Sequence, residues 1–205
     1  RIELSNEPAF DLQEMTLAAW IKVDGFTKPY ETIIAKGQDS WRLTRHALTN
    51  RISFSTDGLS NVHLSGSIPV ADGKWHHVAA VYDGNKKYLY IDGELDAQAN
   101  VTGAIAVNDS PVQIGANADL IGSQSRNFGG LMDEVVIYNH ALNQAELQLV
   151  IATEPWQAID LDSSSDIFTT WEYNLPTILE GPYNIDLEAT DSQGNTSFVS
   201  NAWAG

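Results

Sequence analysis

The chain has 205 residues, of which 27 are acidic and 11 are basic, so its formal net charge is -16 at neutral pH. A surface this acidic is repelled by nucleic-acid phosphates and by anionic lipids, which disfavours both as partners. The sequence has no cysteine, which excludes disulfides, thiolate metal sites and cysteine nucleophiles. No apolar run approaches the ~20 residues of a membrane span, so membrane insertion is not expected.

Short apolar or alternating runs separated by turn residues fill the first three quarters of the chain. Four of these runs are "TLAAWIKV" (16–23), "ETIIAKG" (31–37), "RISFST" (51–56) and "PVQIGA" (111–116). Asp-Gly pairs, the strongest short signal for a tight turn, begin at residues 24, 57, 72, 83 and 92. This spacing predicts an all-β fold of two antiparallel sheets, as in a sandwich or jelly roll.

The stretch "SWRLTRH" (40–46) supplies candidate sugar contacts. Side chains alternate between the two faces of a strand, so Trp41 and Leu43 point one way and Arg42, Thr44 and His46 the other. Core packing is the expected role of the tryptophan, and the opposite face then offers planar polar groups of the kind that bind glycans. The alternative, that the basic residues here pair with carboxylates, stays open.

Two neighbouring histidines open the stretch "WHHVAAVYDGNKKYLYIDGEL" (75–95). The pattern predicts a strand, a turn, a second strand and a second turn. Because adjacent strand residues point to opposite faces, His76 and His77 are not expected to chelate one ion together.

The segment "RNFGG" (126–130) adds Arg126 and Asn127 to the candidate carbohydrate-binding residues, together with the ring of Phe128.

One short helix is predicted in "HALNQAELQLVIA" (140–152). Asn143 is placed to cap its first turn, and Glu146 three residues later is placed to complete a capping box. Leu142 and Leu147 have the spacing of a hydrophobic staple, so the helix is expected to pack on the rim of the sandwich.

After Ala152 the sequence becomes polar, acidic and serine-rich, which is typical of a linker. Strand signals return in "FTTWEYNLP" (168–176) and "GPYNIDLEATDSQGN" (181–195). We therefore expect a jelly-roll domain at 1–152, followed by a linker and a small β module at 153–205 that is too short for a complete immunoglobulin-like sandwich. The alternating acidic stretch "DLDSSSD" (160–166) resembles the start of a calcium loop, although an exposed linker is the favoured interpretation.

Residues 1–151 resemble the laminin-G-like, pentraxin-like branch of the concanavalin A-like jelly rolls. The resemblance rests on "TLAAWIKV", "IIAKG", "SWRL", "GKWHHVAAVYDG", "LYIDGEL", "VQIGA" and "FGGLMDEVVIYNHALNQAEL", in that order along the chain. Members of this family are usually non-catalytic, bind glycans or proteins, and often hold calcium. The family normally has one more strand, ahead of "RIEL", and the tail resembles the second half of a bacterial immunoglobulin-like repeat.

The resemblance also implies metal ligands. Asp133 stands where the family places an acidic calcium ligand, and Asp11 is expected to approach the same rim. Related glucanases use a Glu-x-Asp-x-x-Glu strand for catalysis; Glu94 and Asp96 match its first two acids, but Ala99 replaces the third.

These features predict a non-catalytic carbohydrate-binding or adhesion module of a larger secreted or cell-surface protein, with structural calcium and a glycan or surface protein as partner. One alternative is a structural repeat that associates with itself through open strand edges. Another is a glycan hydrolase or lyase.

Overall fold

The structure is a computed structural model that describes residues 1–4, 7–118, 120, 126–151, 184–190 and 196–204. The chain divides into two compact units, Arg1–Trp156 and Gln157–Gly205. No described helix is long and apolar enough to cross a membrane.

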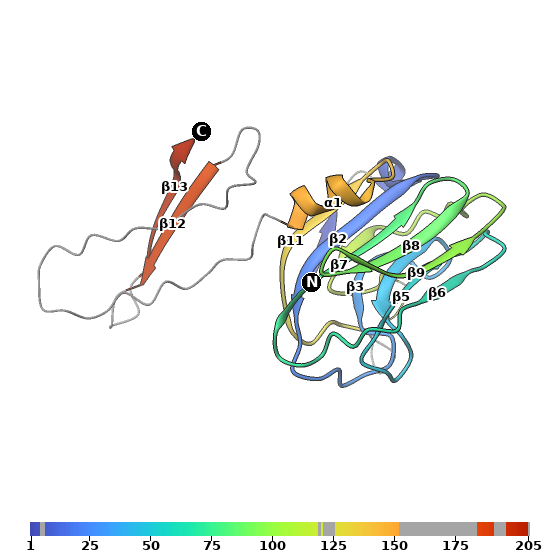
Figure 1. Ribbon diagram of the computed structural model, residues 1–205, viewed down its shortest axis with the longest axis horizontal. Coiled ribbons are helices and arrows are strands. Elements are labelled where there is room, and N and C mark those ends of the chain that lie inside the picture. Colours follow the sequence, from blue (N-terminus) through green and yellow to red (C-terminus); the bar gives the residue numbers. More distant parts are fainter. Residues whose placement is uncertain (5–6, 119, 121–125, 152–183, 191–195, 205) are drawn as a thin grey trace, which may run out of the picture. The chain divides into compact units, whose positions relative to one another are not determined.

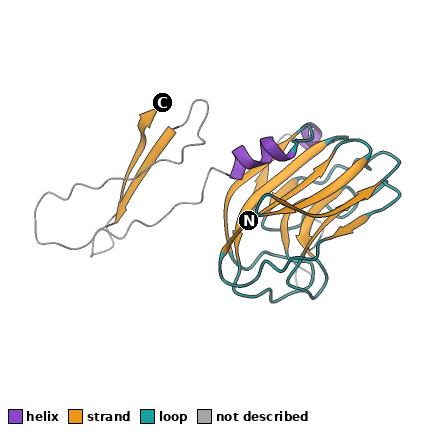
Figure 2. Ribbon diagram, in the orientation of Figure 1, coloured by secondary structure: helices purple, strands orange, loops and turns teal. Residues whose placement is uncertain are grey.

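The first unit consists of two antiparallel sheets (Figures 1 and 2). The strands of the six-stranded sheet, in spatial order, are β1 (Ile2–Leu4), β10 (Val112–Ile114), β3 (Thr32–Lys36), β4 (Trp41–Arg45), β5 (Ile52–Thr56) and β6 (His63–Ser65). Those of the five-stranded sheet are β11 (Leu131–Tyr138), β2 (Met15–Lys22), β7 (Trp75–Tyr82), β8 (Lys86–Ile91) and β9 (Glu94–Asn100). The predicted two-sheet antiparallel jelly roll with one short helix is confirmed.

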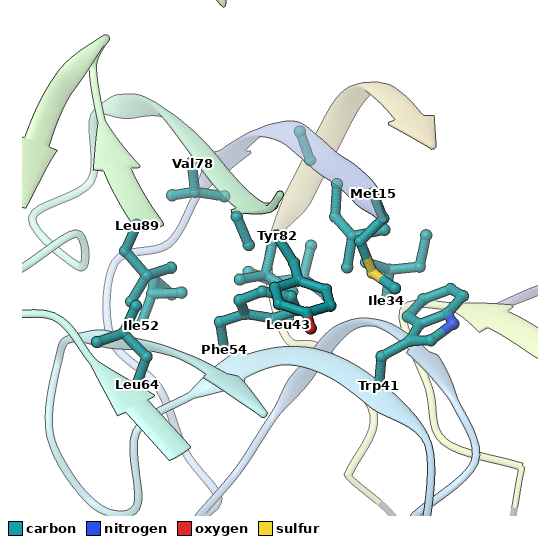
Figure 3. Packing of buried hydrophobic residues seen from close by; sticks show 14 of the residues in the cluster. Met15, Ile34, Trp41, Leu43, Ile52, Phe54, Leu64, Val78, Tyr82 and Leu89 are labelled. Carbon is teal, nitrogen blue, oxygen red and sulfur yellow. The ribbon is translucent and has the colours of Figure 1, made fainter. Parts of the chain in front are cut away.

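The main core lies between the inner faces of the two sheets (Figure 3). Trp41 and Leu43 of β4 are fully buried there and pack with Phe54 of β5 and Tyr82 of β7. Burying each such side chain contributes about 1.5–3 kcal/mol, so this alternation fixes which face of each strand points inward. The indole Nε1 of Trp41 also donates a hydrogen bond to the carbonyl of Phe10, 3.0 Å away, in the short 3-10 helix η1 (Glu7–Phe10).

The helix α1 (Gln144–Ile151) covers the outer face of the five-stranded sheet, where a second apolar cluster includes Leu142 and Leu147 (Figure 1). Its capping box forms as predicted. The Asn143 side-chain oxygen accepts hydrogen bonds from the amides of residues 145 and 146, at 2.9 and 3.1 Å. In return, Glu146 accepts a hydrogen bond of 2.7 Å from the Asn143 amide.

The neighbouring histidines of β7 do point apart. The ring of His77 packs edge-on against Trp20, with their centroids 5.5 Å apart, whereas both nitrogens of His76 lie within 3.0 Å of carboxylates, those of Asp72 and Asp92. These bonds raise the pKa of His76 even though burial opposes them. The two histidines therefore support the scaffold and do not form one site.

The described part of the second unit is an antiparallel pair of strands, β12 (Asn184–Thr190) and β13 (Thr196–Ala204). This pair includes the strand predicted in "GPYNIDLEATDSQGN". The predicted strand in "FTTWEYNLP" and the acidic stretch 160–166 lie outside the described residues, and the immunoglobulin-like character of the tail stays a prediction.

Candidate functional site

A polar cavity lies on the outer face of the six-stranded sheet. Because the apolar side chains of β4, β5 and β6 point into the core, the alternate residues point outward, and cross-strand pairing sets them side by side: Arg42 opposite Ser55, Thr44 opposite Ser53, and Ser55 opposite His63. A cavity of about 310 Å³ is lined by Tyr30, Gln38, Arg42, Thr44, His46, Ser53, Ser55, His63 and Arg126. Its volume is near the lower end of the ~300–1,000 Å³ usual for small-ligand sites.

Four of the five predicted sugar contacts line this one cavity: Arg42, Thr44, His46 and Arg126. The fifth residue, Asn127, is not among the residues that line the cavity. Its backbone forms an isolated β-bridge with Thr32. The structure thus brings Arg126 next to strand residues that lie far from it in the sequence.

One wall of the cavity is a stacked pair, Tyr30 and Arg126. The guanidinium carbon of Arg126 lies 4.7 Å from the centre of the Tyr30 ring, and its Nη1 donates a hydrogen bond of 3.2 Å to the Gln38 side-chain oxygen. Tyr30 is 41% exposed and has a backbone φ of 56°. A non-glycine residue in this left-handed region is strained by about 1–3 kcal/mol, so the surrounding contacts must hold Tyr30 in this conformation.

A buried carboxylate holds this wall in place. Glu31 is fully buried and accepts hydrogen bonds from the amides of Thr27, Lys28 and Gly129, at 2.6, 2.7 and 2.8 Å. These bonds join the loop that carries Tyr30 to the loop that carries Arg126. These hydrogen bonds therefore fix the position of the wall in the folded chain.

The base of the cavity is basic. Arg42 is only 8% exposed and pairs with Asp57 through an Nη1–Oδ2 distance of 2.8 Å. His63 Nδ1 lies 2.9 Å from Ser55 Oγ, and His46 Nδ1 is buried with no hydrogen-bond partner among the described residues.

Burial and the nearby Arg42 cation affect the titration of two lining groups. Burial, followed by Arg42, lowers the pKa of His63, so this ring is neutral at pH 7. The same two causes in the same order lower the pKa of Arg126. The guanidiniums of Arg42 and Arg126 thus lie in a region partly shielded from water.

Sequence reasoning missed Tyr30, Gln38, Ser53, Ser55 and His63 as cavity residues. The serines had a usable signal, since alternation in "RISFST" separates them from Ile52 and Phe54. Tyr30 had none, because its position depends on long-range contacts of a loop.

Both predicted calcium ligands have partners within the chain. Asp11 forms an ion pair with the fully buried Lys36, with an oxygen–nitrogen distance of 3.0 Å. Asp133 lies in β11 opposite Trp20 and accepts a hydrogen bond of 2.9 Å from the Glu134 amide. Calcium takes 6–8 oxygen ligands, and among the described residues no three acidic, histidine or cysteine side chains gather in a way that fits a metal ion.

A second hollow, of about 370 Å³, lies at the rim between residues 22–25 and 129–131. Among the described residues that line it, only Lys22 and Asp24 are charged and none is aromatic. It offers less for sugar recognition than the cavity on the sheet.

Solved structures share this fold. A protein from Bacteroides ovatus ATCC 8483, described as a candidate carbohydrate binding protein, aligns with a TM-score of 0.58 and 18% identity over 94% of this chain, which corresponds to 55% of that protein. The CBM40 domain of a Ruminococcus gnavus sialidase, bound to sialyllactose, aligns with a TM-score of 0.58 and 18% identity over 74% of this chain and 91% of its own.

Domain 4 of the arabinanase AbnA from Geobacillus stearothermophilus, in complex with arabinotriose, aligns with a TM-score of 0.50 and 15% identity over 68% of this chain and 67% of its own. At these identities the likeness shows the fold alone. No curated protein matches the sequence significantly. The model of the laminin-G-type family of the concanavalin A-like lectin/glucanases superfamily matches residues 1–148, and the chain therefore belongs to that family.

Proposed function

We propose that the chain is a non-catalytic carbohydrate-binding module of a larger secreted or surface protein, and that it holds a glycan in the cavity on the six-stranded sheet. The main support for this proposal comes from the residues that line the cavity. They include hydrogen-bonding side chains from three strands beside an exposed tyrosine ring. Sugars are recognised by this combination, because their C–H faces pack on rings while their hydroxyl groups exchange hydrogen bonds.

The solved relatives add support of a general kind, since two were determined with sialyllactose and arabinotriose bound. The alternatives raised by the sequence, a self-associating repeat and a glycan hydrolase or lyase, stay predictions. Structural calcium at Asp133 also stays a prediction, tested by whether a chelator lowers the melting temperature of the wild type but not of Asp133→Ala.

A glycan array followed by calorimetry tests the proposed function with the variant Tyr30→Ala. We expect the wild type to bind at least one oligosaccharide and the variant to bind it at least about fivefold more weakly, because an aromatic platform contributes about 1 kcal/mol or more. Val107→Ala removes an exposed apolar side chain (61% exposed) that does not line the cavity, so it should bind like the wild type. Unchanged affinity in Tyr30→Ala would place the sugar elsewhere, and a wild type that binds no glycan would reject the function.

A further inference from the structure

The cavity is unusual in its charge. The chain has 27 acidic and 11 basic residues, yet among the described residues that line the cavity there are two arginines and no carboxylate. A site for a neutral ligand needs no such reversal of the overall charge.

The two arginines have few partners. A guanidinium has five N–H donors. Within the described part of the chain, the Arg42 side chain gives one to Asp57 and the Arg126 side chain gives one to the neutral Gln38. Most of their donors are thus left for solvent or for a ligand that enters the cavity.

The two cations also repel each other. Arg42 is close enough to lower the pKa of Arg126 and that of His63, and among the described residues only Asp57 pairs with either arginine. Arg126 has no carboxylate partner among the described residues, so a neutral sugar that covered it would strip water from its guanidinium without supplying a counter-charge, which is costly. An anionic group would relieve the repulsion and accept several of the free N–H donors at once.

The net charge of the chain limits how acidic the ligand is. At -16, the molecule as a whole repels densely charged polymers at long range. A cavity of about 310 Å³ nonetheless accommodates one charged group at short range. The ligand that satisfies both conditions is a largely neutral glycan with isolated acidic residues.

We propose that the cavity binds a single carboxylate- or sulfate-bearing sugar residue of an otherwise neutral glycan, with the anionic group held by Arg42 and Arg126. This inference rests on the proposed function and specifies its substrate class.

Matched pairs of oligosaccharides test it by calorimetry on the full chain: xylotriose with and without one glucuronate branch, lactose with and without one sialate, and lactose with and without one sulfate. In at least one pair the acidic member should bind at least tenfold more tightly than the neutral one. The pair that shows this difference identifies the source of the anionic group.

Arg126→Gln should reduce that preference to threefold or less. Lys74→Gln, which removes the same charge from an exposed side chain beside Asp72, should keep it. If neutral and acidic members bind the wild type equally, or if no member of any pair binds, the inference is wrong, whereas the proposed function is decided separately by the glycan array. A preference that persists in a folded Arg126→Gln variant would overturn the assignment to this cavity. The wild-type preference is decisive even if that variant does not fold.

Discussion

Lys87 is a cation in the middle of the core. It lies at an inward-facing position of β8 and is fully buried. Its Nζ donates hydrogen bonds to Oγ1 of Thr56, at the end of β5, and to the carbonyl of Val62, at 3.1 and 2.9 Å. The Phe54 ring centre is 5.4 Å away. Burial lowers the pKa of Lys87 to about 8, a shift that the nearby Asp57 opposes.

This pKa predicts an unusual dependence of stability on pH. Between about pH 8 and 9.5 the folded chain releases the Lys87 proton while the unfolded chain keeps it, so the unfolded state binds more protons and the free energy of unfolding rises with pH. The rise should be about 1–2 kcal/mol over this interval, measured by urea unfolding. The interval ends at about pH 9.5 because tyrosine, with an ordinary pKa of about 10, is increasingly ionised above it.

The control for this effect is Lys87→Met, which keeps an apolar stem of similar length and removes the ammonium. Its stability should be nearly flat over the same interval. Equal slopes in the wild type and in Lys87→Met would show that Lys87 does not cause the rise.

At the scale of the elements, the turn at Asp57-Gly58 is packed against the segment that follows β9. Gly58 has a φ of +90°, and a Cβ built on it would lie 2.2 Å from the Ala104 carbonyl oxygen. The Ala106 amide donates a hydrogen bond of 2.8 Å to the Asp57 carbonyl. Because Asp57 also pairs with Arg42, this turn connects the core to the cavity.

Gly58→Ala should therefore destabilise the fold by about 2–4 kcal/mol, because the new methyl group meets backbone atoms and the positive φ disfavours alanine. Gly25→Ala is the matched control, since Gly25 also follows an aspartate but has no atom within 4 Å of its built Cβ. It should change stability by no more than about 0.5 kcal/mol. Similar losses in both variants, measured by denaturant unfolding, would refute the packing explanation.

The pattern of neighbouring residues predicted the strand faces and the helix cap, but it did not predict contacts between distant segments. The two faces of β4 and the Asn143 cap followed from residues within a few positions of each other, where strand alternation and capping chemistry act. Contacts between distant segments had no such signal. The Glu31 bond to the Gly129 amide spans 98 positions, and it positions Tyr30 and Arg126. The ion pair between Asp11 and Lys36 likewise had no local signal.

For the molecule as a whole, the central feature is a contrast of charge. A strongly acidic chain of 205 residues presents a basic cavity on the outer face of one sheet, while α1 covers the outer face of the other. The two faces thus have separate roles: one completes the core packing, and the other is left open to a ligand.

The most direct measurement is a crystal structure of the chain with the oligosaccharide that binds best among the matched pairs. We predict that the sugar occupies the cavity on the six-stranded sheet, with its acidic group in hydrogen-bond contact with Arg42 and Arg126 and a sugar ring beside Tyr30. A sugar bound instead in the rim hollow between Lys22 and Leu131, with the sheet cavity filled only by water, would contradict it.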